Sequence, residues 1–305
     1  MDEPTRKEIR GVAEQTLRDA GLTDPPLPVG ALLDHLQLYR DYYDLADPGF
    51  LDRAKYKLQI QGRRLVDILN KVRLQAVLLF DEGRICIDEN LPKIKHPWAS
   101  CHETGHRILI WHKPFFYGDT AETLDPTWQE DLEQEANYAA ARLLFLGDRF
   151  TLDARDVQPT VTGLKALAKQ YGTSLTTTLR RYVEQGPDIP MAMLVSTPAW
   201  EPQPADQAHR WRHFVPSPQF ARMFAHVEAD TLRELVDKEA EYRRGGPVAD
   251  FGLDLVDERG DRHEFRAWSF HNQHYLLTLF VEERGIIETR MVVDSKALSK
   301  AMGRK

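Results

Sequence analysis

Apolar residues recur at helical spacing along much of the chain. In residues 5–20 the positions Ile9, Val12 and Leu17 share one face, and Gly21 follows as a suitable C-cap. The same spacing predicts further helices at 29–38, 97–111 and 126–146, two short helices within 160–184, and a helix near 219–243.

Shorter apolar runs between turn residues predict strands. The runs "AVLLF" and "ICIDEN" flank the charged turn from Asp81 to Arg84, which indicates a β-hairpin directly before the helix that starts at residue 97. Alternating apolar and polar residues near the end of the chain predict antiparallel strands within 249–261, 263–270, 274–284 and 286–294.

These elements predict an α+β protein with a division near its middle. Prolines recur between residues 187 and 218, which is typical of a linker. We therefore expect a mainly helical domain with a small antiparallel sheet, a helical subdomain, a Pro-rich linker and a C-terminal α+β domain. Their expected bounds are 1–150, 151–190, 191–218 and 219–305.

Composition narrows the function classes. The 305 residues are 42% hydrophobic and carry a formal charge of −7 without long blocks of one sign, so no surface for nucleic acid or anionic membranes is indicated. The two cysteines form no CxxC motif, and the charged, amphipathic N-terminus does not resemble a secretory signal. Apolar runs are too short to span a bilayer. We expect a cytoplasmic protein that does not enter membranes.

The stretch "KHPWASCHETGHRILIWHKP" carries the candidate chemistry. His102 and His106 are four residues apart, so on a helix both imidazoles lie on one face and can reach one ion. Glu103 lies beside them, within reach of a water molecule on that ion. This is the HExxH pattern of two metal ligands and a general base. The alternative is a helix whose histidines only pack against the core.

A catalytic zinc site needs a third protein ligand, and the helix at 126–146 offers three glutamates. Glu133 shares a face with Asn137, Ala140 and Leu144 and is the preferred ligand. Asn137, one turn further on, is placed to hydrogen-bond a ligand histidine. We expect the other two, Glu130 and Glu135, to be ordinary solvated residues.

The two motifs together resemble the ImmA/IrrE family of bacterial zinc metallopeptidases. "ASCHETGHRIL" and "EDLEQEANYAAARLL" match its paired helices, and the similarity extends over about residues 5–185. The resemblance implies a zincin-like, gluzincin-type metallo-endopeptidase domain. It makes His102, His106 and Glu133 the ligands of Zn²⁺, with Mn²⁺ as the alternative ion. Glu103 then acts as general base and acid on water that the metal activates, with Asn137 orienting a ligand.

Two features depart from the family pattern. The second motif ends in "LLFLGD" without the usual proline, and Cys101 stands where alanine is common. We interpret Cys101 as a small buried residue, although a thiol so close to the ligands could also be redox-sensitive. The groups that stabilise the developing oxyanion stay open among Tyr138, His112 and Tyr117.

Partners follow from the resemblance alone. It implies cleavage of a helix-turn-helix transcriptional repressor, in a stress response or under mobile-element control. Residues 161–183 themselves resemble a helix-turn-helix, but segment 151–190 has five Lys/Arg against four Asp/Glu, which disfavours direct DNA binding. Some relatives carry a sensory domain at the C-terminal end. The alternative function is a non-proteolytic, metal-binding regulator or sensor that binds a repressor or an antitoxin-like partner.

Overall fold

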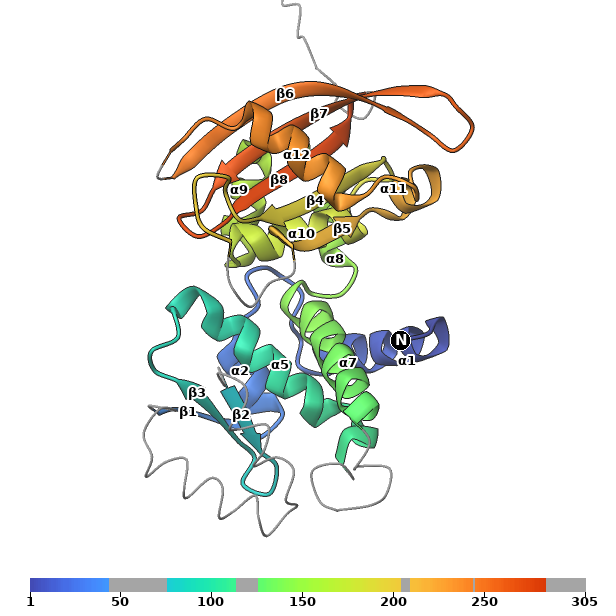
Figure 1. Cartoon of the computed structure of the whole chain (residues 1–305). Coiled ribbons are helices and arrows are strands. Elements are labelled where there is room, and N and C mark those ends of the chain that lie inside the picture. The colour runs from blue at the N-terminus through green and yellow to red at the C-terminus, as the bar shows by residue number, and fades with distance from the viewer. Residues whose placement is uncertain (44–75, 114–125, 204–208, 244, 284–305) are drawn as a thin grey trace, which may run out of the picture. The chain divides into compact units, whose positions relative to one another are not determined.

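The computed structural model describes residues 1–43, 76–113, 126–203, 209–243 and 245–283. They form two compact units (Figure 1). Unit 1 comprises Met1–Val157 and Val161–Pro187, and unit 2 comprises Gln158–Thr160 and Asp188–Lys305. Helices and antiparallel strands occur in both units, so the α+β class is confirmed.

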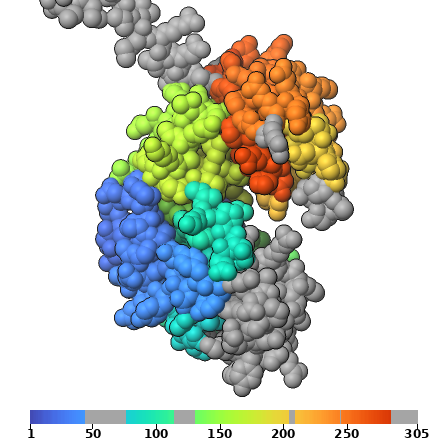
Figure 2. All heavy atoms as spheres, turned by 90° about the vertical axis from the view of Figure 1, so that its left-hand side faces the viewer, coloured from blue at the N-terminus to red at the C-terminus, as the bar shows by residue number. Residues whose placement is uncertain are grey.

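Unit 1 is mainly helical. Its α-helices are α1 (Glu3–Asp19), α2 (Val29–His35), α5 (His96–Ile108), α7 (Pro126–Leu144), α8 (Arg149–Arg155), α9 (Val161–Tyr171) and α10 (Leu175–Gln185), and two 3-10 turns, η1 (Lys93–Lys95) and η2 (Ile110–His112), flank α5. In the space-filling view, residues 1–43 and 76–113 lie side by side on one face of this unit (Figure 2).

The small sheet of unit 1 is mixed. Strands β2 (Ala76–Leu79) and β3 (Arg84–Asp88) pair antiparallel and confirm the predicted hairpin, while β1 (Tyr39–Tyr43) pairs parallel with β3. The expectation of a purely antiparallel sheet is therefore wrong. β1 went unpredicted because its residues, "YRDYY", are exposed or half-buried and show no apolar alternation.

The predicted helices of unit 1 form for the expected local reasons. Asp2 caps α1 by accepting a hydrogen bond from the backbone N–H of Thr5, and the face with Ile9, Ala13 and Leu17 is buried. The helices α9 and α10 confirm the two short helices within 160–184. Gly172 has φ +61° in the turn between them, a conformation that glycine adopts without strain.

Unit 2 is built on a five-stranded antiparallel sheet with the order β5-β4-β8-β7-β6. Its strands are β4 (Met191–Ser196), β5 (Trp211–Pro216), β6 (Gly246–Val256), β7 (Arg262–His271) and β8 (Leu276–Glu282). The helices α11 (Pro218–Met223) and α12 (Ala229–Glu239) pack Phe220, Leu232 and Val236 into a core with apolar residues of the sheet. Three of the predicted C-terminal strands are thus confirmed, and the fourth, at 286–294, lies outside the described residues.

Two predictions in this unit are wrong. The expected linker 191–218 contains β4 and β5, and every residue of β4 is buried between its two neighbouring strands. Prolines lie near the ends of these strands, where a missing N–H does no harm, so they are compatible with a sheet. The single helix near 219–243 is two helices, because the backbone leaves the helical conformation at Phe224.

Candidate metal centre

Helix α5 presents two imidazoles to one point. Pro97 lies in its first turn, where a residue without an N–H is tolerated, and the helix then runs unbroken to Ile108. His102 and His106 project from the same side, with ring centroids 4.9 Å apart and ring planes nearly perpendicular. This is the arrangement expected for residues one turn apart.

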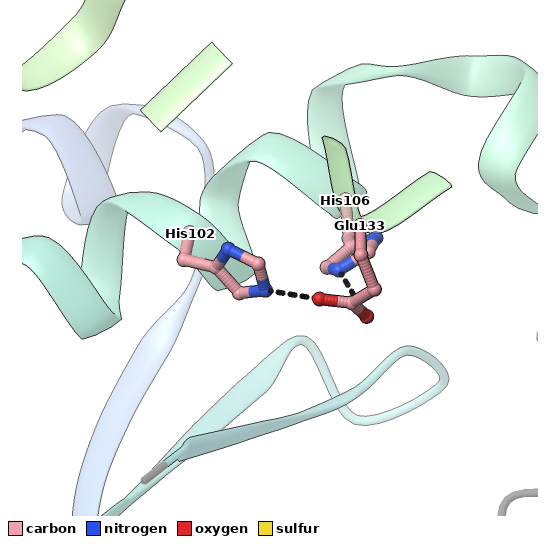
Figure 3. A group of neighbouring side chains, drawn as sticks. All are labelled: His102, His106 and Glu133. Atoms are coloured by element: carbon pink, nitrogen blue, oxygen red, sulfur yellow. Dashed lines mark ion pairs between the residues drawn. The ribbon is translucent and has the colours of Figure 1, made fainter. Parts of the chain in front are cut away.

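Helix α7 brings a carboxylate to the same point. The Nε2 atom of His102 lies 3.2 Å from one oxygen of Glu133, and the Nε2 atom of His106 lies 3.5 Å from the other (Figure 3). Within the described residues, only these three side chains form a group of His, Cys, Asp or Glu that could hold a metal ion, with ligand atoms within 4.8 Å of one another. We call them the His–His–Glu cluster.

Gly105 allows the two helices to come this close. A Cβ atom at this position would lie 2.8 Å from the carbonyl oxygen of Ala136 and 3.3 Å from the Cβ atom of Ala139. Real side chains do not approach a backbone oxygen so closely, so only glycine fits between the two ligand histidines. The glycine thus determines the separation across which Glu133 meets them.

The two nitrogen–oxygen distances in the cluster are compatible with ligands of one zinc ion. Ligand atoms at about 2.0–2.1 Å from a tetrahedral Zn²⁺ lie about 3.3 Å from one another, close to the two observed N–O separations. Two imidazoles and one carboxylate are also a usual donor set for zinc, and half of the Glu133 side chain is exposed, which leaves an open side.

The outer nitrogens of both imidazoles face other groups. His102 Nδ1 lies 3.1 Å from Oδ1 of Asn137, and His106 Nδ1 lies 2.9 Å from Nδ1 of His112. If each ligand ring carries its proton on Nδ1, the lone pairs at Nε2 face the carboxylate oxygens of Glu133. Facing lone pairs repel unless a cation lies between them, so the residues present fit a divalent metal ion.

His102 and Glu133 shift each other's pKa values toward the charged forms. Burial opposes the imidazolium form of His102, but hydrogen bonding to Glu133 and the charge of Glu103 outweigh it and raise its pKa. Burial likewise opposes ionisation of Glu133, yet the two imidazoles, which donate hydrogen bonds to it when they are protonated at Nε2, hold the pKa of this carboxyl well below its usual range. A carboxylate that stays ionised at neutral pH is what a cation requires.

Glu103 lies beside the cluster on α5 and is nearly buried. Burial raises the pKa of its carboxyl group, while the imidazoles of His102 and His106 act against this shift. The backbone N–H of Leu78 in β2 donates a hydrogen bond to the carboxylate. The side chain is thus held between α5 and the small sheet, next to the two histidines.

His112 and Glu135 contact each other beside His106, an arrangement that the sequence did not reveal. Nε2 of His112 lies 3.0 Å from Oε2 of Glu135, and the indole N–H of Trp111 donates to the same oxygen at 2.6 Å. The expectation that Glu135 is a solvated residue is wrong, because its face of α7 packs against α5 and α1. Neighbours on that face are buried: Ala139 and Arg142.

The break in α5 explains why the contact of His112 with His106 was not predicted. On a continuous helix, a residue six positions beyond His106 lies about 120° away from it around the axis. The helix ends at Ile108, and the side chain of Leu109 is buried in a small apolar cluster with Ile9 of α1 and Ala139 of α7. The turn η2 then carries the ring of His112 back to His106.

The remaining predicted candidates are buried away from a substrate, lie apart from the cluster, are exposed, or fall outside the described residues. Tyr138 packs in the apolar cluster beside α1 and contacts Arg10, and Tyr117 lies outside the described residues. His112 is fully buried, so it cannot touch a substrate carbonyl. Cys101 is also fully buried, which raises the pKa of its thiol to about 12. Glu130 is exposed, as expected.

The histidines of unit 2 do not converge. His263 lies between two carboxylates, with Nδ1 2.7 Å from Glu282 and Nε2 3.4 Å from Asp257. Nδ1 of His271 contacts the carbonyl oxygen of Arg243, and His274 is exposed. We call His263, Asp257 and Glu282 the His263 group.

Fold and site together define a mixed α+β protein with a His–His–Glu cluster of the metallopeptidase kind. Residues 65–182 match the family model of the IrrE N-terminal-like domain, the peptidase M78 family. The resemblance to the ImmA/IrrE family is thereby confirmed over this part of the chain, which is similar to the IrrE N-terminal-like domain. Curated protein sequences give no match.

A solved structure extends the likeness of fold to nearly the whole chain. A transcriptional regulator from Mycobacterium tuberculosis superposes with a TM-score of 0.54, covering 94% of this chain and 93% of that one. The identity is 13%, so the likeness concerns the fold alone. In the described residues, no helix combines the length and apolar character needed to cross a membrane.

Proposed function

We propose that the protein is a zinc-dependent endopeptidase that cleaves a regulatory protein. The observation that carries this proposal is the convergence of the His102 and His106 Nε2 atoms on Glu133, with Glu103 buried beside them. The match of residues 65–182 to a peptidase family supports it.

His102, His106 and Glu133 would hold the ion, and the donor set of two nitrogens and a carboxylate favours Zn²⁺, with Mn²⁺ as the alternative. A divalent ion bound there lowers the pKa of water toward about 7 and polarises a peptide carbonyl. Asn137 orients the imidazole of His102 by accepting a hydrogen bond from its Nδ1.

Glu103 supplies the acid–base chemistry. Its carboxylate takes a proton from water as the nucleophile attacks and delivers that proton to the departing amine. Burial supports this role, because it raises the pKa of the Glu103 carboxyl group, and a raised pKa makes a carboxylate a better proton acceptor. The Leu78 N–H holds the group in place during the transfer.

The substrate proposed from the family resemblance is a helix-turn-helix transcriptional repressor. Direct DNA binding by α9 and α10 is disfavoured further by the structure, since Arg181, one of the few basic residues of that segment, is buried. We propose instead that this helical pair frames the peptidase domain and that unit 2 serves as a sensor or recruitment module. The protein would act in the cytoplasm.

The test is incubation of the purified full chain, with and without Zn²⁺, with the repressor encoded next to its gene. We expect discrete fragments by mass spectrometry only with Zn²⁺. The Glu103→Gln variant should lose cleavage by roughly 10²–10⁴-fold, as expected for loss of a general base, while binding the same amount of zinc.

The control is Glu130→Gln, which changes an exposed glutamate on α7 and should cleave normally. If Glu103→Gln cleaves as fast as the wild type, the assigned role is wrong. Tight binding of the repressor without cleavage by any variant would favour the second function, a non-proteolytic regulator. The full-length likeness in fold to a transcriptional regulator supports that alternative.

A further inference from the structure

A continuous row of side chains leads from the His–His–Glu cluster into the interior of unit 1. It runs from His106 to His112 and then to Glu135, with separations of 2.9 Å and 3.0 Å between the contacting atoms. We propose that His112 and Glu135 are positioning residues that fix the ring orientation and proton position of His106 for metal binding. This inference rests on the proposed function.

The chemistry of the three groups admits one consistent assignment of protons. A neutral imidazole that binds a metal through Nε2 carries its proton on Nδ1. His106 therefore donates from Nδ1, and Nδ1 of His112 must accept. The proton of His112 then lies on Nε2, from which it donates to the carboxylate of Glu135. Each nitrogen in the row has a partner of the opposite kind.

Burial of His112 keeps water from competing for the hydrogen bonds of its ring. His112 is fully buried and the Glu135 side chain is 15% exposed, so water does not reach the ring of His112 and cannot take its place beside His106. Trp111 donates a second hydrogen bond to the same oxygen of Glu135, which holds the carboxylate toward His112. Contacts with Trp111 and His112 thus fix the carboxylate of Glu135 at the end of the row.

The two ligand histidines are held differently. His102 is held by Asn137, a single neutral residue that is exposed, whereas His106 is held by an imidazole backed by a carboxylate. A hydrogen bond that ends on an ionised group is stronger than one between neutral groups. Loss of His112 should therefore weaken metal binding more than loss of Asn137.

The experiment measures the Zn²⁺ dissociation constant of the full chain by competition with a chromophoric chelator. The His112→Phe variant retains a ring but offers no acceptor to His106, and we expect its zinc affinity to fall roughly 10–100-fold. In His112→Asn the amide oxygen lies close to the position of the former Nδ1 and can accept, so most of the affinity should return. Asn137→Ala should lose less than His112→Phe.

The matched control is His96→Phe, at the start of the same helix, where Nε2 contacts the carbonyl oxygen of Leu91 and is remote from the row. This control should bind zinc with an affinity within twofold of the wild type. The inference would be wrong if His112→Phe also bound zinc within twofold of the wild type. Equal losses in His112→Phe and His112→Asn would also overturn it, because they would indicate a packing role alone.

A second measurement does not require that any variant folds. Nitrogen-15 spectra of histidine-labelled wild-type protein with Zn²⁺ report which ring nitrogen carries the proton. We expect His112 to be protonated at Nε2 only, and protonation at Nδ1 would overturn the inference. If the wild type binds no zinc, the proposed function fails as a whole, which is distinguishable from tight zinc binding that is insensitive to His112.

Discussion

The two units each contain a group of histidine and carboxylate side chains, and the groups differ in where the ring nitrogens point. In the His–His–Glu cluster the two Nε2 atoms converge on Glu133, while each Nδ1 faces another partner. In the His263 group, one imidazole has a carboxylate at each nitrogen. The residue types are the same, but only the first arrangement leaves nitrogen lone pairs directed at a common point.

This difference separates a candidate metal site from an ion pair. A ring with an acidic partner at both nitrogens is most stable as the imidazolium, which has no lone pair for a metal. Rings held by their outer nitrogens instead present the inner ones as ligands. To recognise a metal site, the hydrogen-bond partner of the outer ring nitrogen is therefore as informative as the presence of histidine and glutamate together.

The largest difference in zinc affinity is expected when one imidazole is removed from each group. His106→Ala removes a ligand, so its zinc affinity should fall by more than roughly 100-fold, beyond the loss expected for an outer partner. His263→Ala should bind zinc as the wild type does. Chelator competition and elemental analysis measure both, and a zinc loss in His263→Ala would show that the two groups are not distinct in this way.

A smaller effect is expected from closing the gap between α5 and α7. Gly105→Ala places a methyl group against the backbone of Ala136, so the helices must separate. We expect a loss of about 1–3 kcal/mol in the free energy of unfolding, typical of overpacking, together with weaker zinc binding.

The matched change for Gly105→Ala is Gly11→Ala in α1, where a Cβ atom meets nothing within 4 Å. It should stabilise the protein by about 0.5–1 kcal/mol, because alanine favours the helix over glycine. Denaturant unfolding measures both variants. Equal stabilisation by the two substitutions would show that a methyl group at position 105 does not force α5 and α7 apart.

The smallest expected change in the free energy of unfolding concerns the His263 group, and it depends on pH. Hydrogen bonding to Glu282, assisted by Asp257, raises the pKa of His263 above its ordinary value of about 6.5. Its stabilising contribution is therefore complete below about pH 6.5 and is lost as the pH rises through the raised value. We expect His263→Gln to lose up to about 1 kcal/mol at pH 6 and much less at pH 9, measured by urea unfolding. A larger loss at pH 9 would contradict this account.

Much of the site followed from spacing within single helices. His102 and His106 share a face of α5, and Glu133 and Asn137 share a face of α7, so four positions could be chosen before any tertiary contact was known. Their roles as ligands and as an orienting residue remain predictions.

The parts that could not be predicted depend on where helices end and which strands pair. His112 reaches His106 only because α5 stops at Ile108, and no local pattern marks that end. Glu135 looked solvated because its helix face is covered by segments distant in sequence. The parallel partner of β3 is likewise a long-range pairing, and the prolines around β4 suggested a linker where the chain instead forms a strand.

The place of β4 between β5 and β8 in its sheet determines where the chain can be cut. A fragment starting at residue 219 would lack both β4 and β5, so β8 would lose its hydrogen-bonded neighbour on one side. The exposed edge would be β8, a strand whose residues are all buried in the intact sheet, and an unpaired strand of this kind can recruit other chains into aggregates. Soluble C-terminal fragments should therefore begin ahead of Met191, at the proline-rich turn that precedes it.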